Sequence, residues 1–73
     1  MRIAEIWYDG HKYALPEGEH LGDNLRAFFG VKRTHDLFIE SDEGDDTLID
    51  KKTSYRIGNR DRFFSLSRKI NNS

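Results

Sequence analysis

The chain has no cysteine, a single proline and no long apolar run in its 73 residues. Without cysteine there is no disulfide framework, no thiolate metal site and no cysteine nucleophile. The apolar runs are too short for a signal peptide or a membrane span, so we expect a cytoplasmic protein with no membrane partner. Hydrophobic residues make up 36% of the chain, which is enough for one small core but not for a large ligand cavity.

Patterns that would indicate catalysis or cofactor binding are also absent. His11, His20 and Glu19 come nearest to a metal site, but adjacent residues of one helix cannot face a single ion. The acidic residues 42–46 lack the regular alternation and the distal glutamate of a calcium loop. No spacing suggests a catalytic triad, and there is no glycine-rich phosphate loop. We therefore expect no bound metal, no cofactor and no enzymatic activity.

The net charge of −1 hides a strong asymmetry along the chain. Residues 35–50 contain no lysine or arginine and carry the acids Asp36, Glu40, Asp42, Glu43, Asp45, Asp46 and Asp50. Residues 51–73 have one acid, Asp61, against Lys51, Lys52, Arg56, Arg60, Arg62, Arg68 and Lys69. Such a charge distribution can orient an encounter with a partner. Alternatively, the two segments are solvated and partly neutralise each other.

A hairpin is predicted at the start of the chain. Residues 3–8 and 11–15 have strand character, and Asp9-Gly10 between them is the dipeptide that best supplies the two positive φ angles of a type I′ turn. A two-residue loop pairs Tyr8 with His11. The more apolar face, which should turn to the core, then holds Ala4, Ile6, Tyr8, His11, Tyr13 and Leu15.

One helix is predicted after the turn at residues 16–19. Its apolar stripe consists of Leu21, Leu25, Phe28 and Phe29, at spacings that indicate a helix from about His20 to Phe29. Gly22 should weaken the first turn by about 1 kcal/mol. Gly30 stands where a left-handed C-terminal cap is wanted.

The remaining chain predicts three more strands. They cover residues 34–40, a short edge strand at 47–49, and 62–68, while 51–61 is expected to be irregular and anchored by Tyr55 and Ile57. In the last strand, Phe64 and Leu66 are expected to face the core and Phe63 to face outward. The order predicts an α+β fold, a mixed sheet of four to five strands with one helix packed across it. Placing the first and last strands side by side in the middle gives a β-grasp arrangement over residues 1–70, with a flexible tail at 71–73.

The order and spacing of several segments resemble ubiquitin-like proteins over nearly the whole chain. The chain looks most like the bacterial ubiquitin-like domains that also occur in tandem as multi-ubiquitin domains. The segments that carry the resemblance are Trp7 to Tyr13, Leu25-Arg26, Leu37 to Glu40, the Asp45-Asp46 pair before Leu48-Ile49, and Arg62 to Ser65. This resemblance implies a protein modifier that works with an E1-like activating enzyme, an E2-like protein, a deubiquitinase-like protease and a target protein. Such bacterial systems are linked to defence against phage.

The C-terminus departs from the family pattern. Conjugated modifiers usually end in Gly-Gly, because an end without side chains passes most easily into the activating enzyme. Here the conjugation or processing site would be Asn71, Asn72 and Ser73. A protease could trim this end, the activating enzyme could accept a non-glycine end, or the domain could serve only for binding. The three residues could also be a frayed terminus.

A partner-binding surface is predicted on the sheet face away from the helix. Trp7, Phe38 and Phe63 would stand there on adjacent strands, and Arg68 and Lys69 complete the predicted set. A strand register shifted by one residue would instead bury these rings. The basic and aromatic residues after Lys51 could also suit single-stranded nucleic acid. The acidic half of the chain and the isoelectric point near 6.3 oppose this, so we expect no nucleic-acid partner.

Overall fold

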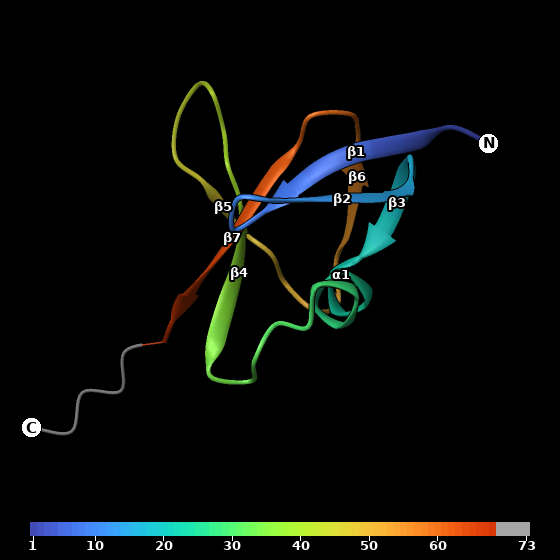
Figure 1. Ribbon diagram of the computed structural model, residues 1–73. Helices are drawn as coiled ribbons and strands as arrows, with labels where there is room; N and C mark the ends of the chain where they lie inside the picture. The colour runs from blue at the N-terminus through green and yellow to red at the C-terminus, as the bar shows by residue number, and fades with distance from the viewer. Residues whose placement is uncertain (69–73) are drawn as a thin grey trace, which may run out of the picture.

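The computed structural model describes residues 1–68. Its elements, in order, are β1 (Ile3–Tyr8), β2 (His11–Pro16), β3 (Gly18–Leu21), α1 (Gly22–Phe29), β4 (His35–Ile39), β5 (Thr47–Leu48), β6 (Ser54–Ile57) and β7 (Arg62–Ser67). Five strands form a mixed sheet in the order β2-β1-β7-β4-β5, and β3 pairs with β6 in a separate two-stranded sheet (Figure 1). The predicted α+β, β-grasp-like fold is confirmed, with β7 in the middle of the sheet beside β1.

The first hairpin forms as the sequence predicts. β1 and β2 pair with Tyr8 opposite His11, and both turn residues have positive φ, 50° at Asp9 and 83° at Gly10. These are the backbone angles that a type I′ turn requires. The alternation of the two strands buries Ala4, Ile6 and Leu15 on one face, as expected. His11, predicted on that same face, is exposed at the end of the strand.

The helix is shorter than predicted. It begins at Gly22 rather than His20, because residues 18–21 pair with residues 54–57 as β3 and β6. Leu25 and Phe29 are buried, whereas Leu21 and Phe28 are partly exposed, so only half of the predicted stripe faces the core. Gly30 ends the helix in the left-handed region as predicted, at φ 68° and ψ 37°.

One small core lies between α1 and the sheet. Its buried residues are Ala4, Ile6, Leu15, Leu25, Phe29, Leu37, Ile49, Ile57 and Phe63. Phe29 is central to the aromatic contacts, with its ring stacked on Tyr8 at 4.7 Å between centroids and 5.2 Å from Phe63. The anchors predicted for residues 51–61 hold, since Ile57 is buried and Tyr55 packs against the core, but the segment is not irregular throughout.

The predicted facing of the last strand is wrong by one residue. Phe63 is only 2% exposed and belongs to the core, whereas Leu66, predicted to be buried, is 55% exposed. The pairing partners decide this, because Phe63 stands opposite Tyr8 on β1 and opposite Ile39 on β4, whose side chains also turn toward the helix. Phe64 therefore faces outward.

A serine on the inner face of β7 explains why the alternation of apolar residues predicted the wrong face for this strand. Ser65 follows Phe63 on that face, and its hydroxyl accepts a hydrogen bond of 2.9 Å from the Tyr8 hydroxyl. Its backbone N–H donates to the Asp9 carboxylate at 3.2 Å. A half-buried polar side chain with such partners costs little, so an apolar residue was not needed there.

Candidate functional site

The sheet face away from α1 carries an apolar surface. Its members are Trp7 on β1, Phe38 on β4, Leu48 on β5, and Phe64 and Leu66 on β7, and we call these five residues the outer platform. Leu48 and Leu66 are 52% and 55% exposed, and the three aromatic rings are half-buried. Exposed apolar groups that gather on one face, rather than lie scattered, are typical of a protein-binding surface.

Strand pairing holds the aromatic centre of the outer platform in place. Phe38 and Phe64 are directly opposite each other, and their rings stack with centroids 5.2 Å apart and planes 9° from parallel. Leu48 stands opposite Phe38 on the other side. Aromatic cross-strand pairs contribute roughly 0.2–1 kcal/mol to the sheet. Stacking therefore favours this arrangement of the two rings before any partner binds, which reduces the entropy lost on binding.

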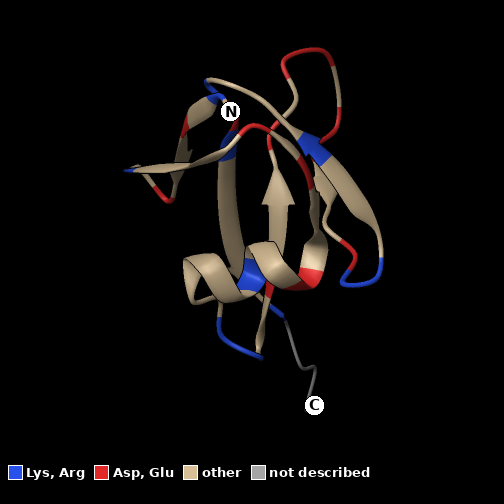
Figure 2. Ribbon diagram, turned by 90° about the vertical axis from the view of Figure 1, so that its right-hand side faces the viewer, with Lys and Arg blue, Asp and Glu red and all other residues tan. Residues whose placement is uncertain are grey.

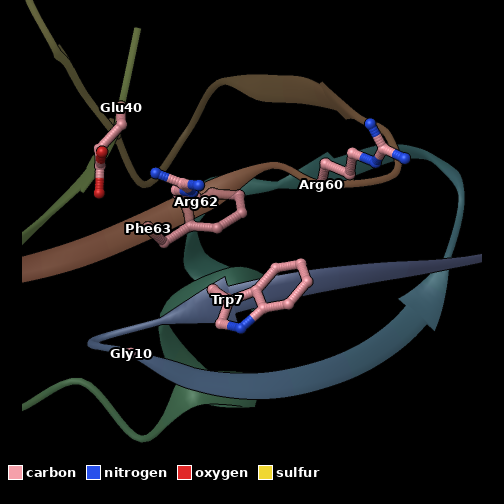
Figure 3. Close-up of a pocket in the computed structure, with 6 residues that line it drawn as sticks. All are labelled: Trp7, Gly10, Glu40, Arg60, Arg62 and Phe63. Carbon is pink, nitrogen blue, oxygen red and sulfur yellow. The ribbon is translucent and has the colours of Figure 1, made fainter. Parts of the chain in front are cut away.

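A hollow opens beside the platform at Trp7. We call it the Trp7 hollow; it measures about 530 Å³ and is lined by Trp7, Gly10, Glu40, Arg60, Arg62 and Phe63 (Figure 3). Trp7 stands on β1, opposite Arg62 at the start of β7. Arg60 comes from the turn that precedes β7, and Figure 3 shows Arg60 and Arg62 across the hollow from the Trp7 indole, with their guanidinium groups well apart. A smaller hollow of about 230 Å³ adjoins it, lined by Glu40, Asp42, Arg60, Asp61 and Arg62.

Arg68, predicted to bind a partner, is held by an ion pair within the domain. Its Nη2 and Nε donate to Oδ1 of Asp36 at 2.8 and 3.2 Å, and its backbone N–H donates to the Thr34 carbonyl at 2.7 Å. The hydrogen bond from Arg68 lowers the pKa of Asp36 below its usual 3.8; desolvation opposes this, and the charges of Arg68 and Arg26 lower the pKa further. The pair is exposed to water, so its contribution to stability is small.

This ion pair predicts the titration of Asp36. Because the folded pKa is lowered, the pair stabilises the fold above the unfolded pKa near 3.8, and this stabilisation is lost as the pH falls through the lower folded value. Carboxyl ¹³C chemical shifts should place the Asp36 midpoint below 3.8 in the native chain. In the Arg68→Gln variant the midpoint should rise toward 3.8. An unchanged midpoint would show that the pair does not form in solution.

The structure separates the predicted partner-binding residues. Trp7 and Phe38 face outward on the open sheet, as predicted, whereas Phe63 is in the core. Sequence reasoning missed Phe64, Leu66 and Leu48 as members of the outer surface. If the pairing of β7 with β1 had been known, Phe64 and Leu66 would have been assigned to the outer face. Lys69 and the predicted conjugation residues Asn71, Asn72 and Ser73 lie outside the described residues.

The charged residues do not form one basic surface. Within residues 1–68, lysine and arginine are spread over several turns and strands (Figure 2). The acidic residues 42–46 form the loop between β4 and β5, which extends from the sheet. The acidic segment 35–50 and the basic segment 51–73 meet at the Arg68–Asp36 ion pair and at the smaller hollow, where Arg60 and Arg62 lie near Glu40 and Asp42.

The described residues contain neither a metal-binding cluster nor a membrane-spanning helix. Residues 1–68 contain no group of three or more His, Asp or Glu side chains placed to hold a metal ion. No helix in that part of the chain has the length and apolar character needed to cross a membrane.

Comparison with known proteins gives no relative. No protein-family model matches the chain, and no curated protein or solved structure is significantly similar to it.

Proposed function

We propose that this chain is a ubiquitin-like protein modifier, and that partner proteins recognise it through the outer platform. The observation that carries the proposal is the stacked Phe38–Phe64 pair, beside exposed leucines on the open face of a β-grasp-like sheet. Aromatic groups at the centre of an apolar patch are frequent anchors of protein interfaces. The cytoplasm, and a bacterial conjugation system linked to defence against phage, would be its setting.

In this proposal the chemistry required of the chain is small. The terminal carboxylate attacks the α-phosphate of ATP bound to an E1-like enzyme, and pyrophosphate leaves. A thiol of the partner then displaces AMP to form a thioester, which an E2-like protein would carry to a nucleophile of the target. The partners supply nucleotide, metal and thiol. A deubiquitinase-like protease would remove Ser73 to leave Asn72 terminal, or release the modifier from its target.

A second candidate is a binding module that is never conjugated. The outer platform favours it, because an apolar binding surface needs no covalent chemistry. In this case the outer platform performs the whole function, and the tail has no chemical role.

One experiment distinguishes the two candidates. The chain carries an N-terminal tag in the cell that it comes from, as native protein, as a variant lacking residues 71–73, and as Phe64→Ser. A modifier should give covalent adducts that survive boiling in detergent, should give none without the tail, and should give fewer with Phe64→Ser. A module should give no adducts but should retain non-covalent partners that Phe64→Ser loses. Equal partner recovery with native and Phe64→Ser protein would contradict both.

A further inference from the structure

We infer that the Trp7 hollow receives an acidic peptide segment, with a carboxylate attracted by Arg60 and Arg62 and an apolar side chain two residues away on the indole of Trp7. The inference rests on the proposed function, since it names the chemistry of the partner that the open sheet face binds. The hollow of about 530 Å³ lies within the size range of side-chain and small-ligand sites.

The first argument is that both guanidinium groups are free. Within residues 1–68, neither Arg60 nor Arg62 makes a side-chain ion pair or a side-chain hydrogen bond. Glu40 is close to Arg62, since its backbone N–H donates to the Arg62 carbonyl at 2.8 Å, but its carboxylate forms no ion pair with that guanidinium. By contrast, the Arg26 guanidinium donates to the backbone carbonyl of Lys32, and the Arg68 guanidinium donates to the Asp36 carboxylate. A guanidinium binds a carboxylate through two parallel hydrogen bonds, so these two arginines are suited to an acidic group from outside.

The second argument is the backbone of Arg60. Its φ of 76° lies in the left-handed region, which a long side chain rarely adopts and where glycine would be unstrained. The turn is nevertheless fixed, because the Arg60 N–H donates to the Glu5 carbonyl at 2.7 Å and the Glu5 N–H donates to Asn59 Oδ1 at 2.9 Å. The Gly58 N–H also donates to Asp61 Oδ2 at 2.8 Å. A strained residue in a well-held turn is typical of a position that is selected for its side chain.

The third argument concerns what lies around the hollow. Trp7 gives an aromatic face, and Phe64 stands two positions after Arg62 on the same face of β7. In an extended peptide, alternate side chains point to the same side, about 6.5–7 Å apart. A segment in which an acidic residue stands two positions from an apolar one can therefore reach both the arginines and the aromatic rings.

The nearby acids favour a peptide over a nucleic acid. Glu40 lines the Trp7 hollow, and Asp42 lines the adjoining one at the base of the acidic loop 42–46. A chain of phosphates would pass these carboxylates and be repelled, because each nucleotide carries a charge. A peptide with a single carboxylate at the arginines avoids this repulsion.

Trp7 allows a direct test, because it is the only tryptophan in the chain. The full chain is titrated with the acetylated, amidated hexapeptide Leu-Ser-Glu-Ser-Leu-Ser, which places one glutamate and two leucines on the same side, while Trp7 fluorescence is followed. The matched probe has glutamine in place of glutamate, and an oligothymidine of eight nucleotides represents nucleic acid. The glutamate peptide should change Trp7 emission and bind at least about tenfold more tightly than the glutamine peptide. Raising the salt concentration should weaken its binding.

Variants connect the binding to the two arginines. Arg60→Gly and Arg62→Gln should each weaken the glutamate peptide by about tenfold, whereas Arg56→Gln, which changes an exposed arginine of β6 away from the hollow, should leave binding unchanged. Arg60→Gly should melt no lower than the native chain, because glycine relieves the positive φ. Arg60→Lys keeps the positive charge and, like arginine, must adopt the positive φ. It should give intermediate binding.

The inference would be overturned if millimolar peptide left Trp7 emission unchanged, if the glutamine peptide bound equally well, or if the oligothymidine bound more tightly. Full peptide binding in both arginine variants would overturn it as well. If the arginine variants bound the peptide fully but Phe64→Ser did not, the inference about the Trp7 hollow would be wrong. The proposed recognition of partners through the outer platform would remain supported. The reverse outcome, peptide binding that needs the arginines while Phe64→Ser retains every cellular partner, would contradict the proposed function alone.

Discussion

Phe63→Ala is expected to lower the free energy of unfolding by about 3–5 kcal/mol. Phe63 is only 2% exposed, and its ring lies 5.2 Å from that of Phe29 on the helix. Alanine would leave a cavity between β7 and α1, where the sheet and helix share their core. Small domains are stable by about 5–15 kcal/mol in total. A chain of 73 residues has little reserve, so the variant should be largely unfolded at physiological temperature.

Phe64→Ala is the matched control for this variant. The two residues are adjacent on β7, but Phe64 faces outward and stacks on Phe38. Its loss should cost about 1 kcal/mol or less, because it removes one cross-strand pair on an open face. Urea denaturation followed by circular dichroism measures both. If Phe63→Ala were folded and stable while Phe64→Ala unfolded, the register of β7 would be the reverse of the one described here.

Local patterns were sufficient to predict most elements of this fold. The Asp9-Gly10 dipeptide gave the first hairpin and its register, and Gly30 gave the end of the helix. The position of the last strand beside the first followed from the order of elements and the need to cover one helix with few strands. These features depend on neighbours in sequence or on a single global choice of topology.

The facing of β7 could not be predicted from its own residues. The pair Phe63-Phe64 provides an aromatic ring to either face, so alternation alone leaves two registers possible. The choice is made by contacts with Tyr8 and Ile39, which lie on two other strands. The predicted binding site inherited this error, because it contained Phe63 in place of Phe64.

The β3–β6 pairing was missed for a related reason. β6 alternates polar and apolar residues, but β3 has no such alternation in its sequence, and Gly18 begins β3 with a φ of 130°. Their pairing joins Gly18 to Ile57 and Leu21 to Ser54 across the whole helix and two strands. The arginines of the Trp7 hollow were missed too, since only the folded turn at Arg60 brings its side chain beside Trp7.

The second large effect is expected at Gly22, the first residue of α1. Helix propensity predicts that Gly22→Ala stabilises the chain by about 1 kcal/mol. We expect the opposite, a loss of about 3 kcal/mol, because overpacking against backbone is costly. A Cβ at this position would collide with the carbonyl oxygen of Asp50, and would lie 2.8 Å from its carbonyl carbon and 3.0 Å from Cγ2 of Ile49.

The collision involves a loop that stabilises the start of the helix. No side chain caps α1, and its first N–H groups instead donate to the Thr53 carbonyl from Gly22 at 2.8 Å and to the Lys51 carbonyl from Asp23 at 3.0 Å. Moving the loop away from a new methyl group would break these bonds and displace the buried Ile49. If α1 moved away from the loop instead, it would separate Leu25 from the core. Either response costs stability.

Gly58→Ala is the control, since a Cβ there would meet nothing within 4 Å and the backbone is not in the left-handed region. It should be neutral or stabilise by about 0.4–1 kcal/mol through the unfolded chain. Thermal melts of the two variants beside the native chain make the comparison. Equal melting temperatures for Gly22→Ala and Gly58→Ala would mean that the loop at residues 50–53 does not pack on the helix start. The glycine would then be a weak point in the helix, as the sequence alone suggests, and the close packing of the loop would not be the reason for it.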